Sequence, residues 1–102
     1  MKVGRGEIWI AQLDPAPGSE MGKRRPVLVV SNDIANEVSN AVTVLPISSN
    51  VDKIYPFEVA AGPEVGLDQE SKIKANQIRT LGKERLTRKI GTLSMAQMSA
   101  AE

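Results

Sequence analysis

The sequence lacks both cysteine and histidine, and it contains one Trp, one Tyr and one Phe in 102 residues. Without cysteine there are no disulfides and no thiolate metal sites. Without histidine the usual general base, the Ser-His and Cys-His nucleophile pairs and most transition-metal sites are excluded. Any catalysis must therefore use Arg, Lys, Glu, Asp, Ser, Thr or Tyr side chains, and we expect neither a metal nor a cofactor.

Long apolar segments are also missing. No N-terminal run resembles a signal peptide, and no stretch approaches the roughly 18 consecutive apolar residues of a membrane span. We therefore expect a cytoplasmic protein with no membrane partner. Residues 1–102 are expected to form a single domain, because a chain of this length buries one core and is too short for two.

The net charge is only +1, but the charge is distributed unevenly. Residues 69–92 contain seven basic residues against two acidic ones, and Lys23, Arg24 and Arg25 form a second basic cluster. A patchy basic surface on a near-neutral protein predicts a localised site for a polyanion.

The spacing of apolar residues and breakers predicts six short strands and little helix. Strands are expected over residues 7–13, 26–31, 41–48, 55–60, 71–81 and 87–93, with a short helix over 34–38, a helical turn over 82–86 and a C-terminal helix from Met95. Pro46 marks a bulge or an edge, and Ile78 is expected to return to the core. With an aliphatic core, this pattern indicates an antiparallel β-barrel or an α+β domain.

The loop before the second strand is about 12 residues long, and loops of that length are usually functional or disordered. Its second half, Gly18–Pro26 (GSEMGKRRP), is charged and punctuated by glycine. Pro26 holds Arg25 extended, because its ring clashes with an α-conformation at the preceding residue. Basic side chains at the mouth of a rigid strand suit the binding of a phosphate. Composition and periodicity alone do not name a function.

Several motifs follow one another in order along nearly the whole chain: RGEIW at 5–9, LDP at 13–15, GSEMGKRRPV at 18–27, SND at 31–33, PIS at 46–48, YPFEV at 55–59 and QIRT at 77–80. With these motifs the chain resembles the MazF/PemK/Kid family of toxin endoribonucleases. The resemblance implies a mainly β, SH3-like antiparallel barrel with short helices, including a C-terminal one. It also implies metal-independent cleavage of single-stranded RNA at short sequence motifs, leaving 2′,3′-cyclic phosphate and 5′-hydroxyl ends. The implied partners are a second copy of the chain, in a homodimer, and a MazE-like cognate antitoxin whose extended segment occupies the RNA groove.

The resemblance implies that Arg25 is the catalytic arginine. Its guanidinium can donate two hydrogen bonds to phosphate oxygens, and we favour this charge clamp over a proton-donor role. Ser48 matches a position where the family commonly has threonine, and Ser49 could substitute for it; the alternative is that the Ser48 hydroxyl simply bonds to backbone at the strand end. Glu20 is a candidate base or a partner that orients Arg25, with a simple loop salt bridge equally open.

Further residues are candidates for RNA binding: Lys23, Arg24, Ser49, Asn76, Gln77 and Arg79. For Lys23 and Arg24 the alternative is surface charge, and for Arg79 it is a structural ion pair. Many relatives carry an acidic residue at the position of Asn76, and this difference could change which RNA base the protein recognises. The aromatic residues Trp9, Tyr55 and Phe57 are expected to pack in the core rather than to stack on bases.

Two other functions compete with the endoribonuclease. One is a non-catalytic toxin of the same barrel superfamily that binds a protein, as gyrase poisons do; the other is an RNA-binding barrel that does not cleave. The retention of Arg25 and of a hydroxyl at Ser48 favours the endoribonuclease.

Overall fold

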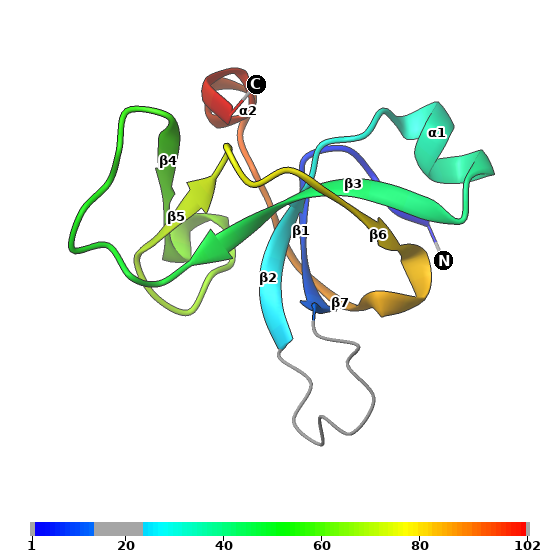
Figure 1. Ribbon diagram of the computed structural model, residues 1–102, viewed down its shortest axis with the longest axis horizontal. Coiled ribbons are helices and arrows are strands. Elements are labelled where there is room, and N and C mark those ends of the chain that lie inside the picture. The colour runs from blue at the N-terminus through cyan, green and yellow to red at the C-terminus, as the bar shows by residue number, and fades with distance from the viewer. Residues whose placement is uncertain (1, 14–23, 102) are drawn as a thin grey trace.

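The computed structural model describes residues 2–13 and 24–101, which form a mainly antiparallel β-sheet with two short α-helices (Figure 1). The strands are β1 (Glu7–Gln12), β2 (Arg24–Val29), β3 (Ala41–Ser48), β4 (Glu58–Ala61), β5 (Ser71–Lys74), β6 (Arg79–Gly82) and β7 (Leu86–Thr92). The helices are α1 (Asp33–Val38) and α2 (Met95–Ala101), and the 3₁₀ turns are η1 (Pro63–Val65) and η2 (Lys83–Arg85). The predicted antiparallel architecture with a C-terminal helix is confirmed. None of the helices in these ranges is long and apolar enough to cross a membrane.

The strands pair in the order β4-β5-β3-β2-β1-β7, and β6 pairs with β3 beside this path. The prediction of a central strand after Pro26 is confirmed, because Val27, Leu28 and Val29 are all fully buried. Successive side chains of a strand point to opposite faces, so the core divides into two clusters. The first cluster is Ile8, Leu28, Leu45, Ile47, Ala61, Val65, Leu67, Ile73, Leu93 and Ala101. The second cluster is Val3, Trp9, Ala11, Val27, Val29, Val42, Val44, Leu81 and Leu86.

The predicted single strand over residues 71–81 is wrong. Instead, β5 pairs with the end of β3, with Ile73 opposite Ile47, and β6 pairs with its beginning, with Arg79 opposite Val44. A separation of three positions in β3, from Val44 to Ile47, therefore lies opposite a separation of six positions, from Ile73 to Arg79. The additional residues bulge outward in a turn over 75–78, which leaves Ile78 63% exposed rather than in the core as expected.

Pro46 lies where β3 changes partners. Thr43 directs its N–H to the Ser31 hydroxyl and its carbonyl to the Val30 N–H, on the β2 side. Because backbone groups alternate along a strand, the Pro46 nitrogen faces the other side, between the β6 and β5 pairings. A missing N–H is tolerated there. β3 itself keeps its register with β2 through Pro46, so Pro46 marks the change of partners on the other side of β3.

The strand expected from Tyr55 begins only at Glu58. Residues 55–58 form a turn in which the Glu58 N–H donates to the Tyr55 carbonyl at 2.9 Å. As a result Tyr55 is 42% and Phe57 49% exposed, and the expectation that they pack in the core is wrong. The same expectation is confirmed for Trp9, which is buried and donates its indole N–H to Glu7 at 3.0 Å.

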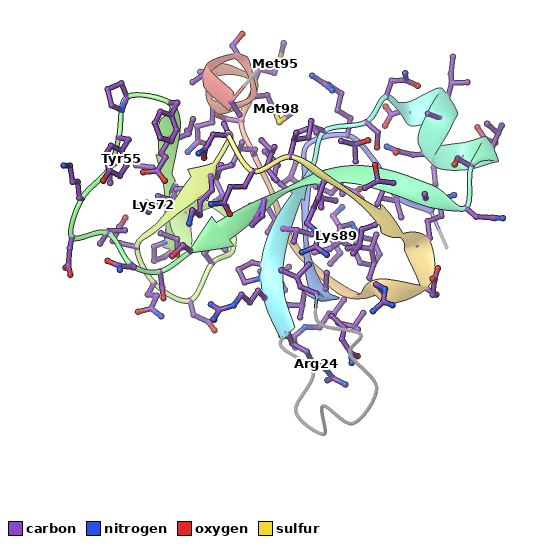
Figure 2. All side chains as sticks on the ribbon, in the orientation of Figure 1. Arg24, Tyr55, Lys72, Lys89, Met95 and Met98 are labelled. Carbon is purple, nitrogen blue, oxygen red and sulfur yellow. The ribbon has the colours of Figure 1, made fainter. Side chains whose placement is uncertain are left out.

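Both helices begin with side-chain caps. Asn32 accepts from the Ala35 N–H at 2.8 Å at the start of α1. Ser94 and Gln97 form a reciprocal capping box at α2, with bonds of 3.1 and 3.2 Å. Helix α2 docks on the first cluster through Met98 and the buried Ala101, whereas Met95 is 90% exposed (Figure 2).

Two glycines allow η1 and β7 to touch through their backbones. A Cβ on Gly91 would lie 1.7 Å from the Val65 carbonyl oxygen. A Cβ on Gly66, whose φ is +100°, would lie 2.0 Å from the Ile90 carbonyl oxygen. Any larger residue would therefore separate the two segments, and the glycine contact fixes the chain that continues from η1 into residues 67–71.

Candidate active site

Arg24 and Arg25 begin β2 and are both exposed (Figure 2, Arg24). The extended conformation predicted for Arg25 before Pro26 is confirmed, and Arg25 is in register with Ala11 of β1. Because side chains alternate along the strand, Arg25 shares the face of Val27 and the second cluster. Arg24 shares the face of the first cluster. The Arg24 and Arg25 side chains therefore lie on opposite faces at this end of the sheet.

A cavity of about 140 Å³ opens beside the two arginines. Its apolar wall is Ile10, Pro26, Ile47, Leu67 and Ile90, and its polar wall is Arg24, Arg25, Ser49, Asp68, Gln69 and Ser71. The buried Ser71 hydroxyl donates to the Gln69 carbonyl at 3.0 Å, which anchors the loop that carries Asp68 and Gln69. Arg24 and Ser49 lie on the cavity side of their strands, and Arg25 contributes to the lining although its side chain is on the other face of β2; cations on both faces of this strand end can hold a phosphate there.

Ser48 ends β3 and is in register with Lys72 of β5. Its Oγ accepts a hydrogen bond from the Asn50 N–H at 3.1 Å, so the backbone contact considered from the sequence is present. An accepted bond leaves the hydroxyl hydrogen for donation to a phosphate oxygen. Ser49 follows on the opposite face and lines the cavity, whereas Ser48 does not.

The residues predicted to read bases lie away from this cavity. Asn76 and Gln77 are exposed in the 75–78 turn, where the Gln77 N–H donates to the Lys74 carbonyl at 3.0 Å. Arg79 is exposed at the start of β6, and its Nη2 donates to the Leu13 carbonyl at a long 3.5 Å. No ion pair between residues of 2–13 and 24–101 includes Arg79. Glu20 and Lys23, also named from the sequence, lie outside the described residues.

A buried ion pair next to Ser48 was not predicted from the sequence. Lys72 Nζ lies 3.1 Å from Glu58 Oε1, and the two side chains are only 10% and 2% exposed. The pKa of Glu58 is lowered, chiefly because the Tyr55 N–H donates to its carboxylate and further because of the Lys72 ammonium. In the sequence Lys72 is one of the seven basic residues of 69–92, and no local pattern indicates that it is buried. No sequence signal pointed to Asp68, Gln69 or Ser71.

A second perturbed carboxylate belongs to the scaffold. Burial alone would raise the pKa of Glu7, but N–H donors from Gly4 and Trp9 and the Lys89 ammonium outweigh it and lower the pKa. Lys89 Nζ lies 3.0 Å from Glu7 Oε2 and so joins β7 to β1. Lys89, one of the basic residues counted in the patchy charge, is therefore part of a structural pair.

Comparison with known proteins gives consistent results. The family described as PemK-like, MazF-like toxin of type II toxin-antitoxin system matches residues 4–102. Endoribonuclease MazF9 of Mycobacterium tuberculosis is 46% identical over 101 residues, which cover 93% of this chain and 86% of that protein. Endoribonuclease EndoA of Bacillus subtilis is 39% identical over 104 residues, covering 100% and 90%. The solved structure of a mycobacterial endoribonuclease in complex with its cognate antitoxin aligns with a TM-score of 0.79 at 27% identity, covering 97% of this chain and 86% of that one.

Proposed function

Since the chain belongs to the PemK-like, MazF-like toxin family and is an endoribonuclease of a type II toxin-antitoxin system, we propose that it cuts single-stranded RNA at short sequence motifs without a metal ion. The 2′-oxygen loses its proton and attacks the adjacent phosphorus. The bond from phosphorus to the 5′-oxygen then breaks, and that oxygen takes up a proton. The products carry a 2′,3′-cyclic phosphate and a 5′-hydroxyl.

Arg25 is proposed to neutralise the charge that the phosphate gains in the transition state. The observation that carries this assignment is the position of Arg25 at the end of β2, exposed and beside the cavity that Arg24 and Ser49 line. A guanidinium fork can donate two parallel hydrogen bonds to nonbridging oxygens. Guanidinium groups keep their proton in proteins, so the charge clamp is the chemically preferred role and the leaving oxygen takes its proton from water.

Ser48 is proposed to donate its hydroxyl hydrogen to the same phosphate. The β2–β3 register pairs Val27 with Pro46. If that register continues by two residues, it brings Arg25 opposite Ser48, on one face of the sheet. Cross-strand partners on one face lie about 5 Å apart at Cβ, within reach of a shared phosphate group. Ser49 is the alternative hydroxyl, on the cavity side.

Glu20 is proposed as the base for the 2′-hydroxyl or as the carboxylate that orients Arg25. Its support is chemical, since the chain has no histidine and Glu20 is close in sequence to the cations Lys23, Arg24 and Arg25. Lys23, Arg24 and Ser49 are proposed to bind backbone phosphates. Asn76, Gln77 and Arg79 are proposed to contact bases, supported by their exposure at and beside the 75–78 turn.

The proposed assembly is a homodimer that a MazE-like antitoxin neutralises by covering the RNA site. The support is the mycobacterial relative solved with its cognate antitoxin. We further propose that residues 1–102 form one toxin domain with the curvature of an SH3-like barrel. The split pairing of β3 with β5 and β6, which bends the sheet around two apolar clusters, supports this shape.

Substitution of Arg25 tests the proposed chemistry. In a buffer with EDTA, Arg25→Ala should lower kcat on a long single-stranded RNA by about 100- to 1000-fold, as loss of one preorganised charge-stabilising donor does. Arg85→Ala in η2, outside the cavity lining, is the matched control and should cut like the wild type. Undiminished cutting by Arg25→Ala would remove Arg25 from the mechanism.

A further inference from the structure

The turn before β4 carries an ordered pair of aromatic rings on the surface. The rings of Tyr55 and Phe57 are stacked, with centroids 5.4 Å apart and planes inclined by 1°. Both remain about half exposed to solvent. Exposed apolar side chains normally occur singly and without fixed geometry, so two parallel exposed rings on one turn call for an explanation.

The buried Lys72–Glu58 pair holds this turn in place from below. Glu58 Oε1 accepts both from the Tyr55 N–H at 2.9 Å and from Lys72 Nζ at 3.1 Å. The same Lys72 ammonium donates to the Lys53 carbonyl at 2.7 Å. Two strands, β4 and β5, and both ends of the 53–58 turn therefore meet at one charge pair (Figure 2).

The rings also lie in a positive environment. Lys53 Nζ lies 4.8 Å and Lys72 Nζ 5.7 Å from the centroid of the Tyr55 ring. An aromatic face flanked by ammonium groups suits a base of an anionic single strand, because bases stack on the ring while the cations attract the phosphates. A purely apolar protein surface would gain nothing from the two cations, so the charge favours RNA as the occupant.

The register brings this surface next to the proposed chemistry. Lys72 is the Cα partner of Ser48 across β3 and β5, and the Tyr55 ring lies over Lys72. Adjacent strands are about 4.8 Å apart, so the rings are only a few strand widths from the end of β2, where Arg25 lies. An RNA strand that continues from the cleaved phosphate past Ser48 and Lys72 would bring a nearby base to them.

We propose that Tyr55 and Phe57 form a stacking platform for one base of the RNA, and that Lys72 and Glu58 are positioning residues that fix the platform relative to Ser48. The proposal rests on the proposed function for the identity of the bound strand. It assigns the platform to substrate affinity and not to bond breaking. Loss of the platform should therefore raise KM and leave kcat nearly unchanged.

The rings themselves are tested first, because substitutions of exposed residues should not impair folding. Tyr55→Leu and Phe57→Leu keep apolar bulk but remove the π-face, and each should raise KM for single-stranded RNA by about 5- to 150-fold, the range for loss of one base–aromatic stack. When 2-aminopurine is placed in the RNA near the cleaved linkage, the wild-type protein should quench its fluorescence and Tyr55→Leu should not. Val38→Ala on α1, 78% exposed and at the opposite end of the molecule from β4 and β5 (Figure 1), is the control.

The positioning role is tested by Lys72→Met and Lys72→Arg. Lys72→Met should raise KM and change the near-ultraviolet circular dichroism of Tyr55, the only tyrosine in the chain, whereas Lys72→Arg should restore both. A wild-type KM in folded Lys72→Met would remove the positioning role. Unchanged KM and quenching in both leucine variants would overturn the platform and leave the rings to a protein partner. If the proposed role of Arg25 were wrong, the Arg25→Ala variant would still cleave RNA. The KM comparisons among the Tyr55, Phe57 and Lys72 variants would still test the platform.

Discussion

Gly91→Ala should destabilise the fold and disturb the cavity, because it forces apart two backbones. The new Cβ would lie 1.7 Å from the Val65 carbonyl oxygen and 3.2 Å from the Gly66 Cα. The obstructing atoms belong to the main chain, so no side-chain rotation can relieve the overlap. Either η1 or β7 must therefore move. Leu67, which follows η1, and Ile90 of β7 both line the cavity, so the movement would disturb its wall.

The expected cost follows from the kind of clash. Overpacking of a closely packed site typically costs about 1–3 kcal/mol, and a backbone obstacle puts this substitution at the upper end, about 3 kcal/mol. In a domain of this size each kcal/mol lowers Tm by roughly 4–8 °C. We therefore expect Gly91→Ala to lower Tm by about 12–24 °C, and to reduce cleavage even at temperatures where the protein stays folded.

Gly82→Ala is the matched control. Its Cβ would meet only the Glu84 carboxylate, at 2.3 Å, and that exposed side chain can rotate away. The φ of Gly82 is −64°, which alanine adopts readily. Thermal unfolding followed by circular dichroism at one protein concentration compares the variants. A Gly91→Ala protein that melts together with Gly82→Ala and the wild type would refute the close contact of η1 with β7.

Two more outcomes are expected at the site. Ser48→Ala should lower kcat by about 100-fold, whereas Ser48→Thr should keep activity and Ser49→Ala should mainly raise KM. Single-turnover cleavage distinguishes these variants. A loss of kcat seen only in Ser49→Ala would assign the hydroxyl role to Ser49 instead. The folded pKa of Glu58 lies below its ordinary value of 4.5, so its stabilising contribution is complete above that value and is lost as the pH falls through the lowered pKa. The Tm difference between wild type and Glu58→Gln should therefore shrink as the pH falls below 4.5, and a difference that stays constant until the carboxylate is protonated would contradict the ion pair.

Much of the fold was predictable because local patterns and tertiary packing agree. The apolar run after Pro26 is buried on both faces, as a central strand must be. The caps at Asn32 and Ser94 act within their own turns, so a few residues are enough to identify them. The same holds for Arg25, whose extended conformation depends on the proline beside it.

The failures have a common physical origin in pairing between distant segments. The turn over 75–78 exists because β3 pairs with two strands in different registers, and no feature within residues 71–81 indicates that shift. Tyr55 and Phe57 are residue types that favour strands. The adjacent Glu58 carboxylate and the Lys72 ammonium, which is distant in sequence, nevertheless hold them in an exposed turn. The wall formed by Asp68 and Gln69 likewise depends on the contact of η1 with β7.

The central claim is attack by the RNA's own 2′-hydroxyl at this histidine-free site, and a substrate change tests it most directly. After the cleaved linkage is mapped in a single-stranded RNA, a second RNA is made with one 2′-deoxy nucleotide on the 5′ side of that linkage. Incubated with the wild-type protein in EDTA, this RNA should bind and remain uncut there, while the unmodified RNA yields 2′,3′-cyclic phosphate and 5′-hydroxyl ends. Cutting at the 2′-deoxy linkage, or a 5′-phosphate product from the unmodified RNA, would contradict the mechanism.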